Sequence, residues 1–296
     1  MEKVRRVKIA IAGGNGFIGT PLAKRLRADG HEVQVWDLPD FDILDRGSID
    51  KHLESFEPEC VVNLAAVLGG MNARNIREIF GVNFIGNLNL ADAAAAVGVK
   101  RFVFASSLTV HGSNDPAHPV SLASPFNPRH AYGASKAASE FALREYAKQG
   151  MTVVALRPTI ILGDTKIDHA PIDFIKTILQ GGEIEIFGTG EHEREWIWID
   201  DAVDGFARAI AFIAAADSGY YPFFLSANRI RMKDLAERVA ARLGGKVKFV
   251  PSQAQAFTLT ADMAESAARL GWSASHDINA MIELLIPLLQ ANAHGT

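Results

Sequence analysis

A glycine-rich turn near the N-terminus constrains the fold of this chain more than any other feature. Residues 9–19 read IAIAGGNGFIG, so that an apolar run leads into Gly13, Gly16 and Gly19 at GxxGxxG spacing. Such a turn needs a residue that adopts positive φ, and it lets the backbone approach a phosphate closely. The free N–H groups of a following helix favour the same anion. The motif therefore predicts a strand, a helix over 16–29 and a dinucleotide site between them.

Short β-branched runs alternate with helical stretches through the first half of the chain. This alternation is typical of a parallel sheet that helices cover on both faces. The expected strands are 8–12, 32–36, 60–64, 101–105 and 152–157, and the expected helices are 16–29, 46–56, 84–97 and 131–149. Gly30 and Gly98 follow two of these helices, where a left-handed residue commonly ends a helix. We predict an α/β fold of the Rossmann type, with a doubly wound parallel sheet.

The pattern changes after Arg157, where glycines and prolines interrupt short elements. Helical patterns return at 201–216, 232–243 and 279–289. We therefore expect a dinucleotide-binding domain over 1–158 and a smaller, mixed, substrate-binding lobe over 159–296. One strand and helix within 194–216 are expected to return to the first domain.

Composition limits the partners and the compartment. The net charge is −4 and no basic stripe occurs, which argues against nucleic acid. No apolar run approaches the roughly 20 residues that span a bilayer, and the apolar run at the N-terminus is too short for a signal peptide. The chain has one cysteine, Cys60, which favours a reducing cytoplasm. Neither the histidines nor Cys60 have the spacing of a metal site, so we expect no metal. The partner is then a small-molecule substrate.

Asp37 stands at the end of the second expected strand, 18 residues after Gly19. A carboxylate there accepts hydrogen bonds from ribose hydroxyls and repels a 2′-phosphate. No Arg or Lys occurs over residues 38–45 to hold such a phosphate. These residues favour NAD over NADP, although Asp37 also has the pattern of a simple turn residue.

Tyr132 and Lys136 lie four residues apart at the start of a predicted helix, so they share one helix face. A free tyrosine has a pKa of about 10, and a nearby ammonium and an oxidised nicotinamide both favour the phenolate. Ser106 and Ser107 follow an expected strand at the edge where ligands of such sheets bind. A hydroxyl there can bond to a reacting oxygen, or it can simply cap a turn. We predict a catalytic set of Ser107, Tyr132 and Lys136.

Taken together, these motifs resemble the NAD-dependent epimerase/dehydratase family of extended short-chain dehydrogenases, in the same order and over nearly the whole chain. The resemblance implies hydride transfer to and from a secondary alcohol, with NAD as cofactor and a nucleotide sugar as substrate. Family members often dimerise through the helices that begin near Phe84 and Ala131, which implies a homodimer. The implied cofactor-binding residues are Gly13, Asn15, Gly16, Phe17, Ile18, Asp37, Asp42, Ile43, Leu64, Ala65, Ala66, Asn83, Tyr132, Lys136 and Pro158.

The same resemblance narrows the reaction. Dehydratases of the family carry an Asp-Glu pair directly after the catalytic Ser or Thr, whereas this chain has Leu108 and Thr109. A 4-epimerase or a simple dehydrogenase remains, with Ser107, Thr109 and Arg194 as the implied substrate-binding residues. Arg194 matches the arginine that binds the substrate diphosphate, but its acidic neighbours also allow a surface ion pair. Ile160 replaces an asparagine that many sugar-nucleotide epimerases use.

Three functions stay open at this point. The first is a nucleotide-sugar epimerase that keeps its NAD through each cycle. The second is an NAD(P)-dependent dehydrogenase or reductase of a sugar acid or another secondary alcohol. The third is a non-catalytic dinucleotide sensor, which would have no need for Ser107, Tyr132 and Lys136.

Overall fold

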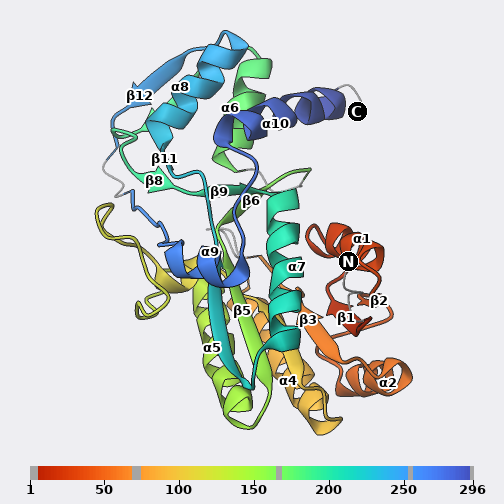
Figure 1. The fold of residues 1–296 in the computed structure, drawn as a ribbon. Helices are drawn as coiled ribbons and strands as arrows, with labels where there is room; N and C mark the ends of the chain where they lie inside the picture. The colour runs from red at the N-terminus through yellow and green to blue at the C-terminus, as the bar shows by residue number, and fades with distance from the viewer. Residues whose placement is uncertain (1–5, 69–74, 165–168, 253–255, 294–296) are drawn as a thin grey trace.

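The computed structural model describes residues 6–68, 75–164, 169–252 and 256–293. Within these ranges, six strands form a parallel sheet in the order β10-β5-β4-β3-β1-β2 (Figure 1). The strands are β1 (Lys8–Ala12), β2 (Glu32–Trp36), β3 (Cys60–Asn63), β4 (Arg101–Ala105), β5 (Thr152–Pro158) and β10 (Gly219–Leu225). The predicted α/β Rossmann-type fold is confirmed.

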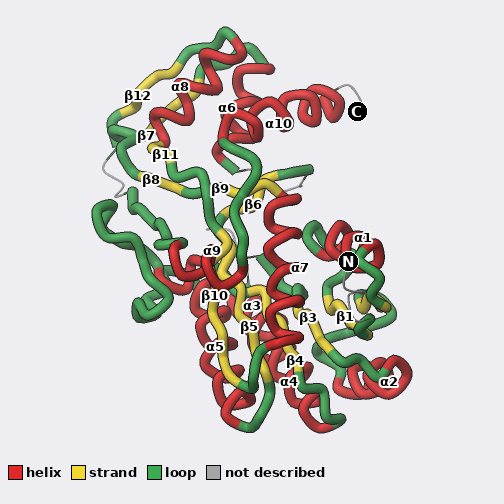
Figure 2. The backbone as a smooth tube through the Cα atoms, in the orientation of Figure 1, coloured by secondary structure: helices red, strands yellow, loops and turns green. Residues whose placement is uncertain are grey.

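Side chains alternate between the two faces of the sheet, and each face has its own core. Ile9 and Ile11 pack with α1 (Gly19–Ala28), α7 (Ile199–Ala215) and α9 (Ala264–Leu270). Ala10 and Ala12 pack on the other face. The helices that cover that face are α2 (Arg46–Phe56), α4 (Asn87–Ala96) and α5 (Ala131–Lys148). Figure 2 shows helices on both sides of the strands, as a doubly wound sheet requires.

The direction of strand order reverses between β1 and β3. Ligands of open α/β sheets bind beyond the carboxyl ends of the strands at such a switch point. The glycine turn after β1 and the Leu64–Ala66 segment after β3 both leave the sheet there, so the topology places the predicted cofactor residues at one edge.

The second lobe lies at the top of Figure 1 and has a separate core. Its helices are α6 (Ala170–Leu179), α8 (Met232–Leu243) and α10 (Ile278–Ala293), and β7 (Ile184–Phe187) pairs in parallel with β12 (Val247–Val250). Two short pairs lie between the lobes, namely β6 (Ile160–Leu162) with β9 (Trp196–Trp198), and β8 (Glu193–Arg194) with β11 (Ile230–Arg231). Ile175, Leu235 and Met281 are fully buried at the centre of this lobe.

The chain returns to the main sheet later than its sequence pattern suggests. Helix α7 packs against α1 and β5, whereas β9 pairs with β6 rather than with the main sheet. The strand that does return is β10, which pairs with β5. Its sequence, GYYPFFL, does not alternate and contains Pro222. Proline is tolerated because β10 is an edge strand. The missing alternation and the proline explain why the sequence pattern did not predict this strand.

Two helices begin elsewhere than expected. Helix α1 begins at Gly19 instead of residue 16, because the glycine turn stays open over three more residues. The helix expected over 84–97 is the last part of a longer run: α3 (Ile76–Phe80), a π-helical turn η1 (Gly81–Gly86) and α4. Such π-turns often occur at functional sites, and this one carries Asn83.

Candidate active site

The cofactor cradle begins at Gly13, which has φ = +75°. A Cβ at this position would lie 2.6 Å from the backbone nitrogen of Ala65, so the turn after β1 and the segment after β3 approach each other more closely than a side chain allows. The Gly13 N–H donates to the carbonyl of Trp36 at 2.9 Å and ties the same turn to β2. Only glycine fits this position.

Asp37 fixes the other side of the turn. Its carboxylate accepts the N–H of Asn15 at 2.9 Å through Oδ2, and the N–H of Leu38 at 2.9 Å through Oδ1. Each oxygen keeps a further lone pair for ribose hydroxyls. In the described part of the chain, no Lys or Arg is ion-paired with Asp37. This carboxylate therefore fits NAD.

The start of helix α1 is open to an anion. Its N-cap residue is Ile18, which gives no side-chain cap, and its first turn carries no acidic residue. Asn15 and Gly16 are exposed, and Phe17 is half-buried. The unpaired N–H groups of such a helix end suit the diphosphate of a dinucleotide.

Asn83 joins the cofactor edge to the catalytic helix. Its Oδ1 accepts the N–H of Val67 at 2.7 Å, and its Nδ2 donates to the Val67 carbonyl at 3.0 Å and to Ser135 Oγ at 3.1 Å. This buried amide is thus occupied by protein groups. Its direct contact with cofactor stays a prediction, and its observed contacts are with the segment after β3 and with α5.

The other predicted cofactor residues lie around this edge. Asp42 is exposed and accepts the N–H of Leu44 at 2.8 Å, which caps its own turn. Ile43 is buried, and a Cβ on Gly86 of η1 would lie 2.7 Å from its side chain. Pro158 is buried at the end of β5. A role for these residues in binding the cofactor also stays a prediction.

Lys136 and Tyr132 occupy one face of α5, at its N-terminal end. The buried Lys136 Nζ donates to the carbonyl of Ala105 at 2.7 Å and lies 5.7 Å from the centre of the Tyr132 ring. Burial lowers the pKa of Lys136 to about 7, although the charge of Glu140 partly counteracts this effect. The lysine is therefore held at the end of β4, next to the phenol that it is predicted to influence.

Ser107 completes the predicted catalytic set. Burial raises the pKa of Tyr132 to about 12, while a hydrogen bond with the Ser107 side chain favours the phenolate and lowers that pKa. Ser107 Oγ also accepts two hydrogen bonds, from Thr109 N–H at 3.2 Å and from Thr109 Oγ1 at 2.9 Å. With both acceptor sites of Ser107 filled, its own proton is left for donation to Tyr132 or to a ligand.

Thr109 was predicted to bind substrate, and the structure gives it an additional role. Its hydroxyl hydrogen is used on Ser107, so only its oxygen lone pairs remain for a ligand. Leu108 is buried among apolar residues. In the described ranges, no carboxylate is hydrogen-bonded to Ser107 or Tyr132. The acid and base that a dehydratase places there have no counterpart.

Arg194 contacts backbone carbonyls and an aromatic ring instead of the carboxylates of its acidic neighbours. Its Nη1 donates to the backbone carbonyls of Glu193, at 2.9 Å, and of Phe257, and its guanidinium lies 4.2 Å from the centre of the Phe257 ring. Across the described residues, no carboxylate forms an ion pair with Arg194. Burial lowers the pKa of Arg194 to about 10. The surface ion pair considered as an alternative is therefore wrong.

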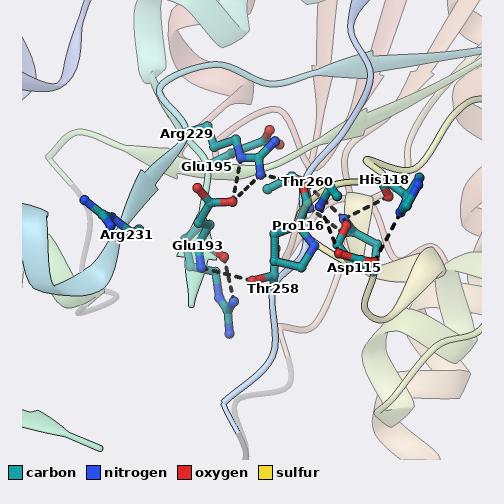
Figure 3. A network of polar contacts seen from close by, with 12 residues as sticks. Asp115, Pro116, His118, Glu193, Glu195, Arg229, Arg231, Thr258 and Thr260 are labelled. Carbon is teal, nitrogen blue, oxygen red and sulfur yellow. Dashed lines mark hydrogen bonds and ion pairs between the residues drawn. The ribbon is translucent and has the colours of Figure 1, made fainter. Parts of the chain in front are cut away.

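The acidic neighbours of Arg194 have other partners (Figure 3). Glu193 pairs with Arg229. The buried Glu195 accepts the hydroxyl of Ser226 at 2.5 Å and the N–H of Ala261 at 3.0 Å. These contacts fasten the segment that carries Arg194 to the chain around residues 258–261.

Arg229 of the second lobe and Asn114 of the first domain join the two lobes near Arg194. Arg229 donates to the Pro116 carbonyl at 2.5 Å and also binds Glu193 (Figure 3). Asn114 Nδ2 donates to Thr260 Oγ1 at 3.1 Å. The loop after β4 is thereby held against the second lobe.

The sequence did not single out two residues near Arg194, namely Phe257 and Arg129. The Arg129 guanidinium lies 4.8 Å from the centre of the same Phe257 ring that Arg194 contacts. Arg129 directly precedes His130, the N-cap of the catalytic helix α5, so Phe257 links Arg194 to that helix. No motif marks Phe257, and the only signal for Arg129 is its place three residues before Tyr132.

A cavity of about 560 Å³ lies beside this arginine pair. Its lining combines aromatic rings with backbone and side-chain polar groups, and includes Phe187, Phe257, His192, Ser113 and Asn114. Pockets of this size and composition suit small molecules. The described residues contain no cluster of side chains that would hold a metal ion, and no described helix is long and apolar enough to cross a membrane.

Comparisons with known proteins identify the family of this chain. The sequence profile of the NAD dependent epimerase/dehydratase family matches residues 9–221. A UDP-glucose 4-epimerase of Mycolicibacterium smegmatis is 30% identical over 230 residues, which are 69% of this chain and 73% of that protein. A probable UDP-glucuronate 4-epimerase of Rhizobium meliloti is 27% identical over 230 residues, 68% of this chain and 67% of that protein.

Solved structures share the fold. A UDP-glucose 4-epimerase of Thermotoga maritima, solved with UDP-glucose, has a TM-score of 0.85 and 23% identity over 97% of this chain and all of that one. A UDP-glucose-4-epimerase of Stenotrophomonas maltophila, solved with NAD and a formylated UDP-arabinopyranose, has a TM-score of 0.86 and 20% identity over 98% of this chain. That chain is covered completely.

The glycine cradle, Asp37 and the open end of α1 fit the dinucleotide for which the family is named. The chain is an enzyme of the NAD-dependent epimerase/dehydratase family, and NAD is its cofactor.

Proposed function

We propose that this enzyme is a nucleotide-sugar 4-epimerase in which Tyr132 is the acid and base. The observation that carries the proposal is the convergence of Ser107, Tyr132 and Lys136 at the end of β4, where no carboxylate of the described residues is hydrogen-bonded to Ser107 or Tyr132. Relatives named as UDP-glucose 4-epimerases support the substrate class.

The three side chains have separate tasks. Bound NAD supplies the acceptor and donor of the hydride at the sugar carbon. Tyr132 takes the proton of the sugar hydroxyl and later returns it. A phenolate on Tyr132 and an ammonium on Lys136 stabilise each other, because both lie in the same poorly hydrated site. Ser107 donates a hydrogen bond to whichever oxygen carries the negative charge, that of the Tyr132 phenolate or that of the sugar.

Arg194 and Arg129 support a diphosphate substrate. Both guanidiniums contact the ring of Phe257, and neither is ion-paired with a carboxylate in the described part of the chain. Planar, paired donors suit phosphate oxygens, and a cation without a carboxylate partner can give its charge to such a ligand. Arg194 is half-buried and Arg129 is exposed. The adjacent cavity offers Phe187 and Phe257 as faces for a nucleobase.

A dehydrogenase or reductase of a sugar acid or another secondary alcohol is the second candidate, because Ile160 supplies no polar group where many sugar-nucleotide epimerases carry an asparagine. Ile160 lies in β6 and pairs with Trp196, so that part of the site is apolar. A dehydrogenase must release reduced cofactor in every cycle, whereas an epimerase regenerates NAD in place. Retention of the cofactor therefore separates the two functions.

The test uses the purified enzyme without added cofactor. We expect NAD to be released on heat denaturation, and we expect UDP-glucose and UDP-galactose to interconvert, followed by their anomeric proton signals in NMR. Tyr132→Phe removes one hydroxyl and should abolish interconversion while NAD stays bound. In a parallel assay with added NAD, NADH accumulation with sugar acids or another secondary alcohol, and no interconversion of any nucleotide sugar, would refute the epimerase and support the dehydrogenase.

A homodimer through α4 and α5 belongs to the same proposal. Phe141 of α5 and Ile85 of η1 are 56% and 45% exposed, on elements that pack together. Exposed large apolar side chains of this kind favour burial against a second copy. Light scattering after size exclusion should give the mass of two chains, and Phe141→Glu should give the mass of one.

A further inference from the structure

A fully buried ion pair lies behind the catalytic residues. Glu140 of α5 and Arg157 of β5 have no exposed side-chain surface. Arg157 Nε lies 3.0 Å from Glu140 Oε1, and Arg157 Nη2 lies 2.6 Å from Oε2, so the pair is bidentate. Removing either partner would leave an uncompensated buried charge.

Two hydroxyl groups and one imidazole complete the cluster. Ser106 Oγ donates to Oε1 of Glu140, and the hydroxyl of Tyr220 donates to Oε2. Arg157 Nη1 donates to His111 Nε2 at 3.1 Å, and His111 Nδ1 lies 3.2 Å from the carbonyl of Pro125. Burial and the Arg157 charge lower the pKa of His111 to about 4, so His111 is neutral. The cluster holds one negative and one positive charge.

The cluster is joined to the catalytic set at two points. Glu140 follows Lys136 by four residues and Tyr132 by eight, which places all three along one face of α5. Ser106 stands between Ala105, whose carbonyl holds Lys136, and Ser107. The Ser106–Glu140 hydrogen bond therefore connects the catalytic helix to the end of β4, where the serine and the lysine anchor are fixed.

We propose that Glu140 is a positioning residue: through Ser106 it holds Ser107 and the Ala105 carbonyl in register with Tyr132 and Lys136, and Arg157 keeps Glu140 in place. This role rests on the proposed function, because it concerns the same catalytic set. Glu140 touches neither the cofactor edge nor the cavity. A bond that only stabilised the fold would not need to end on the residue between Ala105 and Ser107.

The charge of Glu140 gives a second consequence. The titratable and charged groups that face Lys136 and Glu140 are Tyr132 on the same helix, Arg157 on β5, His111 after β4 and Tyr220 on β10. Among the described residues, Glu140 is the only carboxylate that raises the pKa of Lys136. Replacing it with a neutral side chain makes Lys136 lose its proton at lower pH.

The first experiment uses Ser106→Ala, which leaves both charges of the ion pair intact. Its matched control is Ser266→Ala, because Ser266 is also a buried serine with a buried hydrogen bond, to the Phe224 N–H at 2.9 Å, and it lies in α9, outside the catalytic set and the Arg194 segment. A hydrogen bond to a charged group contributes enough free energy to hold the end of β4 in place. We therefore expect a roughly tenfold lower kcat in Ser106→Ala, with KM unchanged. Ser266→Ala should also lose stability and keep its kcat. Equal effects of both variants on kcat, or an effect of Ser106→Ala on stability alone, would overturn the proposal.

The second experiment does not depend on the substrate. In enzyme labelled with ¹³C-lysine, the Lys136 signal is identified by its loss in Lys136→Arg and titrated by NMR. In Glu140→Gln, Lys136 should titrate at lower pH than in the wild type, and the alkaline limb of kcat should shift in the same direction. An unchanged titration of Lys136 would refute the role of Glu140. If no nucleotide sugar is converted, the proposed function fails, but this titration still decides the role of Glu140.

Tyr220→Phe covers the case in which Glu140→Gln does not fold. This variant removes one hydroxyl from the cluster and leaves the charges, and it should lower kcat less than Ser106→Ala.

Discussion

The direction of the Ser107 proton gives a sharp prediction at the active site. Thr109 supplies two donors to Ser107 Oγ, its N–H at 3.2 Å and its Oγ1 at 2.9 Å. Thr109→Val preserves the shape of the side chain and removes one of these donors. Ser107 can then accept a hydrogen bond from a neutral Tyr132 instead of donating to its phenolate, so the variant should hold Tyr132 more often in its inactive form.

The expected size follows from one lost hydrogen bond. A neutral hydrogen bond contributes about 0.5–1.5 kcal/mol, and about 1.4 kcal/mol changes a rate tenfold. We therefore expect kcat to fall roughly three- to tenfold in Thr109→Val. Because the Ser107 hydrogen bond lowers the pKa of Tyr132, its loss raises that pKa. The acid limb of the pH–rate profile should move to higher pH.

A steady-state assay of nucleotide-sugar interconversion across pH measures both effects. Thr109→Ser keeps the hydroxyl and should behave like the wild type. In a Ser107→Ala background, Thr109→Val should have no further effect, because the acceptor is gone. Wild-type activity of Thr109→Val, or equal losses in Thr109→Val and Thr109→Ser, would refute the reasoning.

Three further predictions concern Gly13, the pair of Arg129 and Arg194, and Glu195. Gly13→Ala adds a Cβ at positive φ, which costs about 1–2 kcal/mol before any clash, so its melting temperature should fall and NAD should no longer co-purify; normal NAD content would contradict the cradle. Arg129→Gln and Arg194→Gln should each raise KM for a nucleotide sugar at least tenfold with kcat little changed, and an unchanged KM in either variant would remove that arginine from the site. Burial raises the pKa of Glu195 to about 7, so the stability that its protonated form contributes is present below pH 4.5 and is lost as pH rises through 7. Glu195→Gln should unfold in urea much as the wild type does at pH 5 and be more stable by about 3 kcal/mol at pH 8; equal stability at pH 8 would contradict that pKa.

Local patterns in the sequence predicted most of the first domain. The strands at 8–12, 32–36 and 101–105 and the helix at 46–56 have the predicted bounds. These segments combine a clear period with a defined start or stop, and their burial follows from neighbours in sequence. The proposed catalytic set was predicted for the same reason, because Tyr132 and Lys136 lie one helical turn apart.

Contacts between distant segments were beyond local patterns. Strand β10 pairs with β5 across 67 residues of sequence, from Thr152 to Gly219, and carries a proline that argues against a strand. Phe257 stands in a segment without periodicity, although it contacts both Arg129 and Arg194. The ion pair of Glu140 and Arg157 joins a helix to a strand. Only the folded chain reveals such pairs.

The central claim is that hydride leaves the sugar and returns to it within one site. The most direct measurement gives the enzyme UDP-glucose deuterated at C4, together with free unlabelled NAD, and locates the label by NMR. We expect deuterium to stay at C4 of the UDP-galactose product and the free cofactor to remain unlabelled. Deuterium in free NADH, or net formation of NADH with a 4-keto product, would contradict it.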